Sequence, residues 1–453
     1  MPSRHGRSRP VFGLLAGFLL AAGTPADEPR FAPEQLQADL DFIASEIRSN
    51  HPDPAHSVDP AQFERHVKAL RSSLKTPLTR DQAWAAFATL NPLLADAHLL
   101  VAYPDWRGAA KAHLAGGGTF FPFEVSIADD GTPVVTGLLG GGSTPLAGRR
   151  IRSIDGEDAR KRTADVLARS HGDTAAFRAE LASRRWFFLD WKLFGPQAEY
   201  EIEFEGTAAP QRTKAGRAAP VFLADESSFE RQFSLEPLPC GAALLTASTF
   251  AWPDKPQFLD FTGDAFERIK SSGARTLIID VRANTGGDDE YWMEGILPHI
   301  ADKPYRHGSR YRKRVIGKYR DEGETAGTVV TGEIDGWVQP EPANSRRFDG
   351  KVYLLIGRST YSSTILFANV MQDFGFGTLA GAAPTARAEQ SGSVQQSLLP
   401  NTGLVLVWPR FVLERPSGAT DPVLLTPDVI VEDDPLRPRA AVEALLRASG
   451  ACS

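Results

Sequence analysis

The sequence lacks the short motifs that most often mark nucleotide or zinc chemistry. Across 453 residues it contains no GxxxxGK[ST] phosphate-binding loop, no CxxC pair and no HExxH segment. Nucleotide-dependent and zinc-dependent functions are therefore disfavoured. The chain has a net charge of -6 and therefore lacks the surplus of basic residues that is typical of nucleic-acid-binding proteins. We expect no metal, no cofactor and no nucleic-acid partner.

Cysteine is scarce, because the chain contains only Cys240 and Cys452. In an oxidising compartment the two could form a disulfide that ties the C-terminal tail to the middle of the chain. Two free thiols agree equally well with the sequence, since separation along the chain gives no distance in space.

No apolar run reaches the roughly 20 residues needed to cross a bilayer. The longest candidate, Val11 to Ala22, follows three arginines and precedes the small-residue segment Thr24-Pro-Ala26. This arrangement is typical of a cleaved secretion signal. We predict a signal peptide at residues 1–26 and an exported mature protein, periplasmic or secreted, without stable membrane insertion. An uncleaved anchor is the alternative.

The part that follows the signal has a helical pattern. Over residues 27–110, apolar residues such as Leu36 and Leu40 recur at helical spacing. Thr79 and Gln82 have the spacing of a capping box, which predicts the start of another helix. These patterns predict a small helical N-terminal domain.

A β-rich pattern occupies residues 111–211. Tyr200, Ile202 and Phe204 alternate with glutamates, which predicts a strand with one buried face and one solvated acidic face. We interpret the glutamates as the solvent-exposed face of the strand and not as a metal site.

Strands and helices alternate over residues 212–453, which predicts an α/β sheet domain. Leu277 to Val281 and Val352 to Ile356 are continuous apolar runs, as expected for strands that are covered on both faces. Residues 306–350 are polar and glycine-rich, and we expect them to form a long surface excursion.

Two segments of this domain carry the strongest chemical signal. Leu277 to Gly287 predicts a buried strand that ends in a Gly-Gly loop, and Ser359 to Gly375 predicts a strand exit, a serine pair and a helix. A serine nucleophile needs a base and donors for the oxyanion. Ser362, at the start of the expected helix, is the candidate nucleophile, with the Ser363 N–H as one donor. A simple helix N-cap is the alternative for Ser362.

Together, these two segments resemble the serine peptidase family that includes the tail-specific (C-terminal processing) peptidases and the tricorn core. Leu398-Pro-Asn-Thr-Gly403 and Thr426-Pro-Asp-Val-Ile430 resemble two later landmarks of that family, in the expected order. The resemblance runs from about residue 31 to 435 and implies a ClpP/crotonase-type α/β fold. Gly131 to Gly156 is similar to the PDZ-like module that the family often carries, but in degenerate form.

The resemblance also restricts the general base. One branch of the family uses a Ser/Lys dyad, whose lysine would fall near Arg387 or at Ser391, and the chain has no lysine after Lys351. Arginine cannot replace it, because its guanidinium keeps its proton. Leu94-Ala-Asp-Ala-His-Leu-Leu100 resembles the Asp-Gly-His segment of the tricorn-like branch, with alanine in place of glycine. This makes His98 the candidate base.

A histidine base needs an acid to orient it. In the family a glutamate precedes the Pro-Asp landmark, and the matching position here, six residues before Pro427, is Asp421. Glu414 is the alternative acid, and a turn aspartate is the structural alternative for Asp421. Asp280, Asp288 and Asp289 lie beside the Gly-Gly loop and could instead orient substrate, although we expect Asp280 to be buried and structural.

These observations predict an exported serine peptidase that acts on peptide or protein substrates. The predicted catalytic residues are Ser362, His98 and Asp421, and the predicted oxyanion donors are the N–H groups of Ser363, Gly286 and Gly287. One alternative is an inactive exported binding protein on the same fold. Another is a crotonase-fold enzyme for acyl thioesters, which the export signal disfavours.

Overall fold

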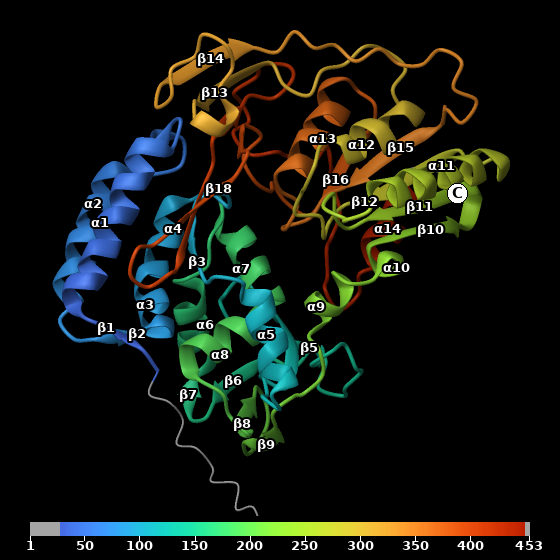
Figure 1. The fold of residues 1–453 in the computed structure, drawn as a ribbon. Coiled ribbons are helices and arrows are strands. Elements are labelled where there is room, and N and C mark those ends of the chain that lie inside the picture. The colour runs from blue at the N-terminus through green and yellow to red at the C-terminus, as the bar shows by residue number, and fades with distance from the viewer. Residues whose placement is uncertain (1–27, 449–453) are drawn as a thin grey trace, which may run out of the picture.

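The structure is a computed structural model that describes residues 28–448 (Figure 1). The predicted signal peptide lies outside the described residues. Cys240 lies within the described residues and is disulfide-bonded. Cys452, the other cysteine of the sequence, lies outside the described residues. Within residues 28–448, no helix combines the length and the apolar character that crossing a membrane requires.

The N-terminal part is helical, as predicted. Its elements are β1 (Arg30–Phe31), α1 (Pro33–Asn50), α2 (Pro60–Ser73), β2 (Leu78–Thr79), α3 (Arg80–Phe87), α4 (Asn91–Leu94), β3 (Leu100–Ala102) and α5 (Trp106–Ala115). The predicted capping box is present, since the Thr79 hydroxyl accepts from the Gln82 N–H and the Gln82 side chain accepts from the Thr79 N–H. The apolar side chains of α1, including Leu36 and Leu40, are buried.

Short strands and helices follow, in the region with the PDZ-like resemblance. They are β4 (Phe123–Ile127), β5 (Pro133–Leu138), β6 (Ile151–Ile154), β7 (Glu157–Asp158), α6 (Ala159–Leu167), α7 (Ala175–Arg184), α8 (Trp186–Phe194), β8 (Glu199–Phe204) and β9 (Gln211–Lys214). Tyr200, Ile202 and Phe204 are buried on β8, as their alternation predicts. One hydrophobic core joins this region to the helical part, so the two pack together.

A six-stranded sheet forms the centre of the third part, in the order β10-β11-β12-β15-β16-β21. Its strands are β10 (Phe233–Leu238), β11 (Ala242–Ala247), β12 (Thr276–Asp280), β15 (Lys351–Leu355), β16 (Thr378–Gly381) and β21 (Val429–Ile430). All neighbours are parallel except β10 and β11. The helices are α9 (Val221–Asp225), α10 (Phe229–Gln232), α11 (Lys255–Ser271), α12 (Glu290–Gly295), α13 (Ser363–Asp373) and α14 (Ala440–Ala448).

Both faces of this sheet are covered, which explains the continuous apolar sequence of β12. Leu277 and Ile279 pack into a core that contains Phe266 of α11 and Phe367 of α13. Ile278, between them, points to the opposite face and packs into the core that includes residues of α14. Alternating side chains of one strand therefore enter two different cores.

The predicted surface excursion at residues 306–350 contains regular structure. It forms β13 (Arg310–Arg314) and β14 (Val329–Glu333), which join β20 (Phe411–Leu413) and β17 (Gln390–Gly392) in a four-stranded sheet. Figure 1 shows β13 and β14 at the periphery, beyond the helices of the central sheet. The sequence missed this sheet because β13 pairs with β20 of a distant segment, for example Tyr311 with Leu413, and β14 pairs with β13.

A second hairpin connects the two halves of the chain. Its strands are β18 (Gln395–Leu398) and β19 (Val405–Trp408), and β19 pairs with β3 of the N-terminal part. Because β3 begins two residues after His98, this pairing brings the candidate base toward the C-terminal half.

Candidate active site

Ser362 lies at the carboxyl edge of the central sheet. The parallel strands β12 and β15 are neighbours, so the loops that follow them meet at one edge, where active sites of α/β sheets form. Ser362 has φ 55° and ψ -129°, in a region that residues with a side chain rarely adopt without strain. It is the N-cap residue of α13, yet its side chain makes no capping hydrogen bond. Its hydroxyl is therefore available for another contact, which disfavours the N-cap alternative.

The contact is with His98. His98 Nε2 lies 3.0 Å from Ser362 Oγ, and the two residues are 264 positions apart in the chain. His98 occupies the loop between α4 and β3, where Ala95 has a left-handed φ of 44°. The structure thus brings the predicted nucleophile and the predicted base within hydrogen-bonding distance.

Ser391, on β17, contacts the other ring nitrogen of the histidine. Its hydroxyl lies 2.9 Å from His98 Nδ1 and donates a hydrogen bond of 2.8 Å to Asp96 Oδ1. Since that hydroxyl proton points to Asp96, the Ser391 oxygen accepts from an Nδ1–H of His98. Nε2 then carries the lone pair and faces Ser362, which is the tautomer that a general base requires.

Asp96 is buried beneath this chain of hydrogen bonds. Its Oδ1 also accepts from the backbone N–H of His98 at 2.7 Å, and its Oδ2 lies 4.0 Å from His51 Nε2. Burial by itself would raise the pKa of Asp96, but the neighbouring imidazoles of His51, His98 and His56 hold that pKa well below its usual range. Asp96 is therefore an anion at neutral pH, placed to stabilise a positive charge on His98.

The structure does not bring Asp421 to His98. Asp421 is exposed, and no hydrogen bond or ion pair within residues 28–448 links it, or the alternative acid Glu414, to the histidine. Asp96, linked through Ser391, occupies the place beside His98 that the sequence assigned to Asp421. Both of these residues lie in segments that the sequence singled out: Asp96 belongs to the motif around His98, and Ser391 is one of the positions matched to the family lysine.

The Gly-Gly loop packs directly against the turn that carries Ser362. A Cβ added to Gly286, whose φ is +100°, would lie 2.6 Å from Ser362 Cβ, so glycine is required there. The Gly286 N–H donates to Asn284 Oδ1 at 2.8 Å and is therefore not free to bind an oxyanion. The N–H groups of Gly287 and Ser363 have no acceptor among the described residues, and they are the two donors that remain.

A network around Tyr361 holds the His98 loop against the nucleophile turn. The Tyr361 hydroxyl donates toward Asp173 Oδ1 at 2.8 Å and Asp96 Oδ1 at 3.2 Å, and it accepts from the Ala97 N–H at 3.1 Å. Arg387, the other position matched to the family lysine, donates to the Ala95 carbonyl at 2.6 Å. Burial, followed by the charge of Asp96, raises the pKa of Asp173 to about 6.

The electrostatic environment of His98 suits a general base at neutral pH. Burial lowers the pKa of His98 below its ordinary value of 6.5, while the Asp96 carboxylate and the contact with Ser391 oppose that effect. His98 is therefore neutral and able to accept a proton near pH 7.

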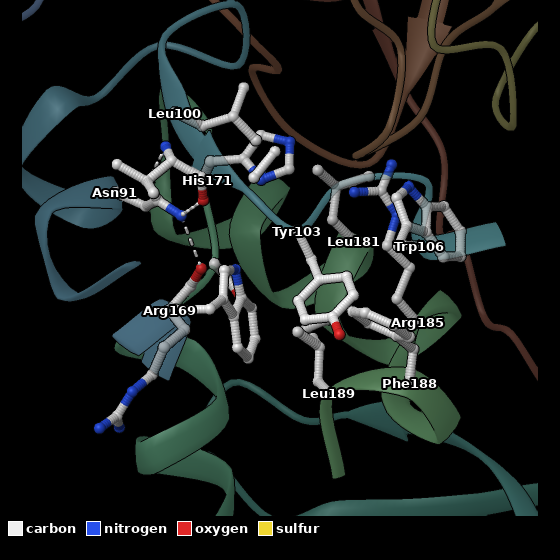
Figure 2. Close-up of a pocket in the computed structure, with 15 residues that line it drawn as sticks. Asn91, Leu100, Tyr103, Trp106, Arg169, His171, Leu181, Arg185, Phe188 and Leu189 are labelled. Atoms are coloured by element: carbon white, nitrogen blue, oxygen red, sulfur yellow. Dashed lines mark hydrogen bonds between the residues drawn. The ribbon is translucent and has the colours of Figure 1, made fainter. Parts of the chain in front are cut away.

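A cavity of about 80 Å³ lies between the N-terminal part and the region that follows it (Figure 2). Neither Ser362 nor His98 lines it. Figure 2 shows Asn91 at one side, where its amide donates to the carbonyls of Val101 and Arg169. Asn91 also accepts from the Val101 N–H at 2.7 Å. These contacts anchor β3, the strand that follows the His98 loop.

Comparison with known proteins agrees with this geometry. Residues 246–431 match the sequence profile of peptidase family S41, whereas no curated protein matches the sequence significantly. The solved structures that are similar include mature CPAF bound to lactacystin, 16% identical, with 92% of this chain and 97% of that chain covered and a TM-score of 0.65. Mature CPAF itself is 16% identical, with 92% of this chain and 96% of that chain covered and a TM-score of 0.64.

At this identity the likeness is one of fold, and it extends beyond the segment that the family profile matches. Residues 246–431 thus match peptidase family S41, the tail-specific peptidase family, and this match supports a serine-type peptidase.

Proposed function

We propose that the protein hydrolyses peptide bonds with Ser362 as nucleophile and His98 as general base. The observation that carries this proposal is the 3.0 Å contact between His98 Nε2 and Ser362 Oγ, made by residues from separate parts of the chain. A helix N-cap or a structural histidine would not need that contact.

The reaction begins when Ser362 Oγ attacks the carbonyl carbon of the substrate and its proton moves to His98 Nε2. The imidazolium donates through Nδ1–H to Ser391, whose hydroxyl donates to the Asp96 carboxylate. The N–H groups of Gly287 and Ser363 bind the oxyanion of the tetrahedral intermediate. His98 then gives its proton to the leaving amine, and the C–N bond breaks to leave an ester on Ser362. Water, activated by His98, hydrolyses that ester.

We also propose that the mature protein works outside the cytoplasm. The signal-like N-terminal sequence supports this, as does the disulfide-bonded state of Cys240, because disulfides persist mainly in oxidising compartments. N-terminal sequencing of the protein recovered from a periplasmic or culture-medium fraction tests the proposal, with a mature terminus near residue 27 as the expected result.

Labelling with a fluorophosphonate probe, followed by mass-spectrometric mapping, tests the chemistry. We expect modification of Ser362, with strong loss of labelling in His98→Ala and complete loss in Ser362→Ala. His66→Ala is the matched control, because His66 contacts Thr89 and lies outside the site. Absence of label on the folded wild-type protein would contradict the proposal and favour a binding protein on the same fold.

A further inference from the structure

A cavity of about 350 Å³ opens beside the nucleophile. Its lining includes Ser362, Ser363 and Gly287, the residues that carry the nucleophile and the two free N–H donors. The cavity therefore lies next to the position that a substrate carbonyl held by those donors would take. This makes it a candidate site for the residue on the acyl side of the scissile bond.

The walls of the cavity are mostly apolar. Leu366 comes from α13, Tyr311 from β13, and Phe411 and Leu413 from β20. Such walls can hold a long alkyl chain by burying its methylene groups. Because β13 belongs to the excursion, the 306–350 segment builds one side of the cavity.

One carboxylate, that of Asp289, also lines the cavity. Ser363 Oγ donates to Asp289 Oδ1 at 2.5 Å and accepts from Trp292 Nε1 at 2.9 Å. The Ser363 hydroxyl therefore links the Asp289 carboxylate to the start of α13, and Trp292 fixes that hydroxyl. Asp289 is thus held in place inside the cavity by its contact with Ser363.

Asp289 has no lysine or arginine partner among residues 28–448, and the charge of His307 is the cationic influence on its pKa. Within residues 28–448 it forms no ion pair, while other shielded acids of this part do: Asp373 pairs with Arg415, and Asp280 with Arg282. The cavity lining contains no lysine or arginine, and its only basic group is His307. Burial raises the pKa of Asp289, as expected for a carboxylate that has lost hydration without gaining a full counter-charge.

We infer that Asp289 selects substrates with lysine or arginine at the residue whose carbonyl Ser362 attacks. The apolar walls contact the alkyl part of that side chain, and its terminal cation pairs with the Asp289 carboxylate. This inference deepens the proposed function and rests on it, since selection at this cavity requires that Ser362 be the nucleophile.

The test uses amino-terminally blocked fluorogenic peptides that differ only in that residue: lysine, arginine, glutamine, leucine or glutamate. We expect kcat/KM for lysine and arginine to exceed that for glutamine by about 10- to 100-fold, because a hydrogen bond to a charged group contributes about 1.5–3 kcal/mol. In Asp289→Asn, which keeps an acceptor for Ser363, the ratio of kcat/KM for lysine over glutamine peptides, measured within the variant, should fall to about twofold.

Asp288→Asn is the matched control. Asp288 is exposed, does not line the cavity and accepts from the Glu290 N–H at 3.0 Å. We expect it to retain the wild-type preference for basic residues. A second variant, Leu413→Ala, should weaken cleavage of lysine and leucine peptides together, because it removes wall contacts without touching the charge.

Fluorophosphonate labelling in each variant separates the two hypotheses. A labelled Ser362 with no preference for basic residues, or a preference that survives in Asp289→Asn, overturns the inference about Asp289 and leaves the proposed chemistry standing. A wild-type protein that is not labelled at Ser362 overturns both.

Discussion

The hydroxyl of Ser391 donates a 2.8 Å hydrogen bond to the buried carboxylate of Asp96. Because the same hydroxyl lies 2.9 Å from His98 Nδ1, the acid acts on the base through an intervening serine. The direct distance between Asp96 Oδ1 and His98 Nδ1 is 3.9 Å, too long for a hydrogen bond. Under the proposed mechanism, Asp96 and Ser391 are positioning residues, with separate and measurable effects.

Replacing Asp96 with asparagine should lower kcat by about 10²-fold or more, because the imidazolium loses its counter-charge. Ser391→Ala should lower kcat by about tenfold, since Asp96 remains close enough to act through space. Steady-state kinetics on the preferred peptide, with thermal unfolding as a check on folding, measures both. Asp421→Asn is the control, and a loss of activity there equal to that of Asp96→Asn would contradict the assignment.

The pH profile should report the environment of His98. Since burial lowers the pKa of His98, we expect kcat/KM to stay high below pH 6.5 and to fall as the histidine becomes protonated at lower pH. Asp96 opposes the effect of burial, so the residual activity of Asp96→Asn should have its acidic limb at still lower pH. A limb that shifts to higher pH in this variant would show that Asp96 is not an anion beside His98.

Removing the Tyr361 hydroxyl should loosen the loop that carries His98. Tyr361→Phe leaves Asp96, Asp173 and the Ala97 N–H without a shared partner, which costs about 1–3 kcal/mol of stability. We expect kcat to fall by about tenfold with little change in KM, because the substrate cavity is not lined by Tyr361. Tyr305→Phe, at another buried tyrosine, is the control and should keep wild-type kcat.

Gly286→Ala should abolish fluorophosphonate labelling. Its Cβ would lie 2.6 Å from Ser362 Cβ and 2.8 Å from the Tyr361 carbonyl oxygen, which forces the nucleophile turn away from the loop. Gly273→Ala tests the backbone effect alone, because Gly273 also has a positive φ of +69° but nothing within 4 Å of the added Cβ. That control should lose about 1 kcal/mol of stability and keep its labelling. Equal labelling of both variants would refute the close approach.

Acid should destabilise the folded protein partly through His299. Burial, followed by the charge of Arg346, lowers the pKa of His299 from 6.5 to about 4. Between those pH values the unfolded chain binds a proton that the folded protein does not, so stability falls as pH decreases through this window. His299→Gln should therefore show a smaller drop in Tm between pH 7 and pH 5 than the wild type. An unchanged drop would contradict this role.

The sequence by itself determined the strands and helices whose patterns are local. Leu277 to Val281 is apolar throughout because both faces of β12 are covered, and Thr79 with Gln82 capped a helix as their spacing required. The sequence also identified Ser362 and His98 as candidates, because the nucleophile turn and the histidine motif are each contained in a few consecutive residues.

Only the tertiary structure decided which groups meet. Asp96 acts on His98 through Ser391, a residue 295 positions away from Asp96, and not through the exposed Asp421. The pairing of β19 with β3 and the Tyr361 network likewise join segments that are far apart in the chain. The hydrogen bond from the Gly286 N–H to Asn284 depends instead on the exact direction of the backbone. Local spacing carries no information about such contacts, because they form only when the distant elements pack together.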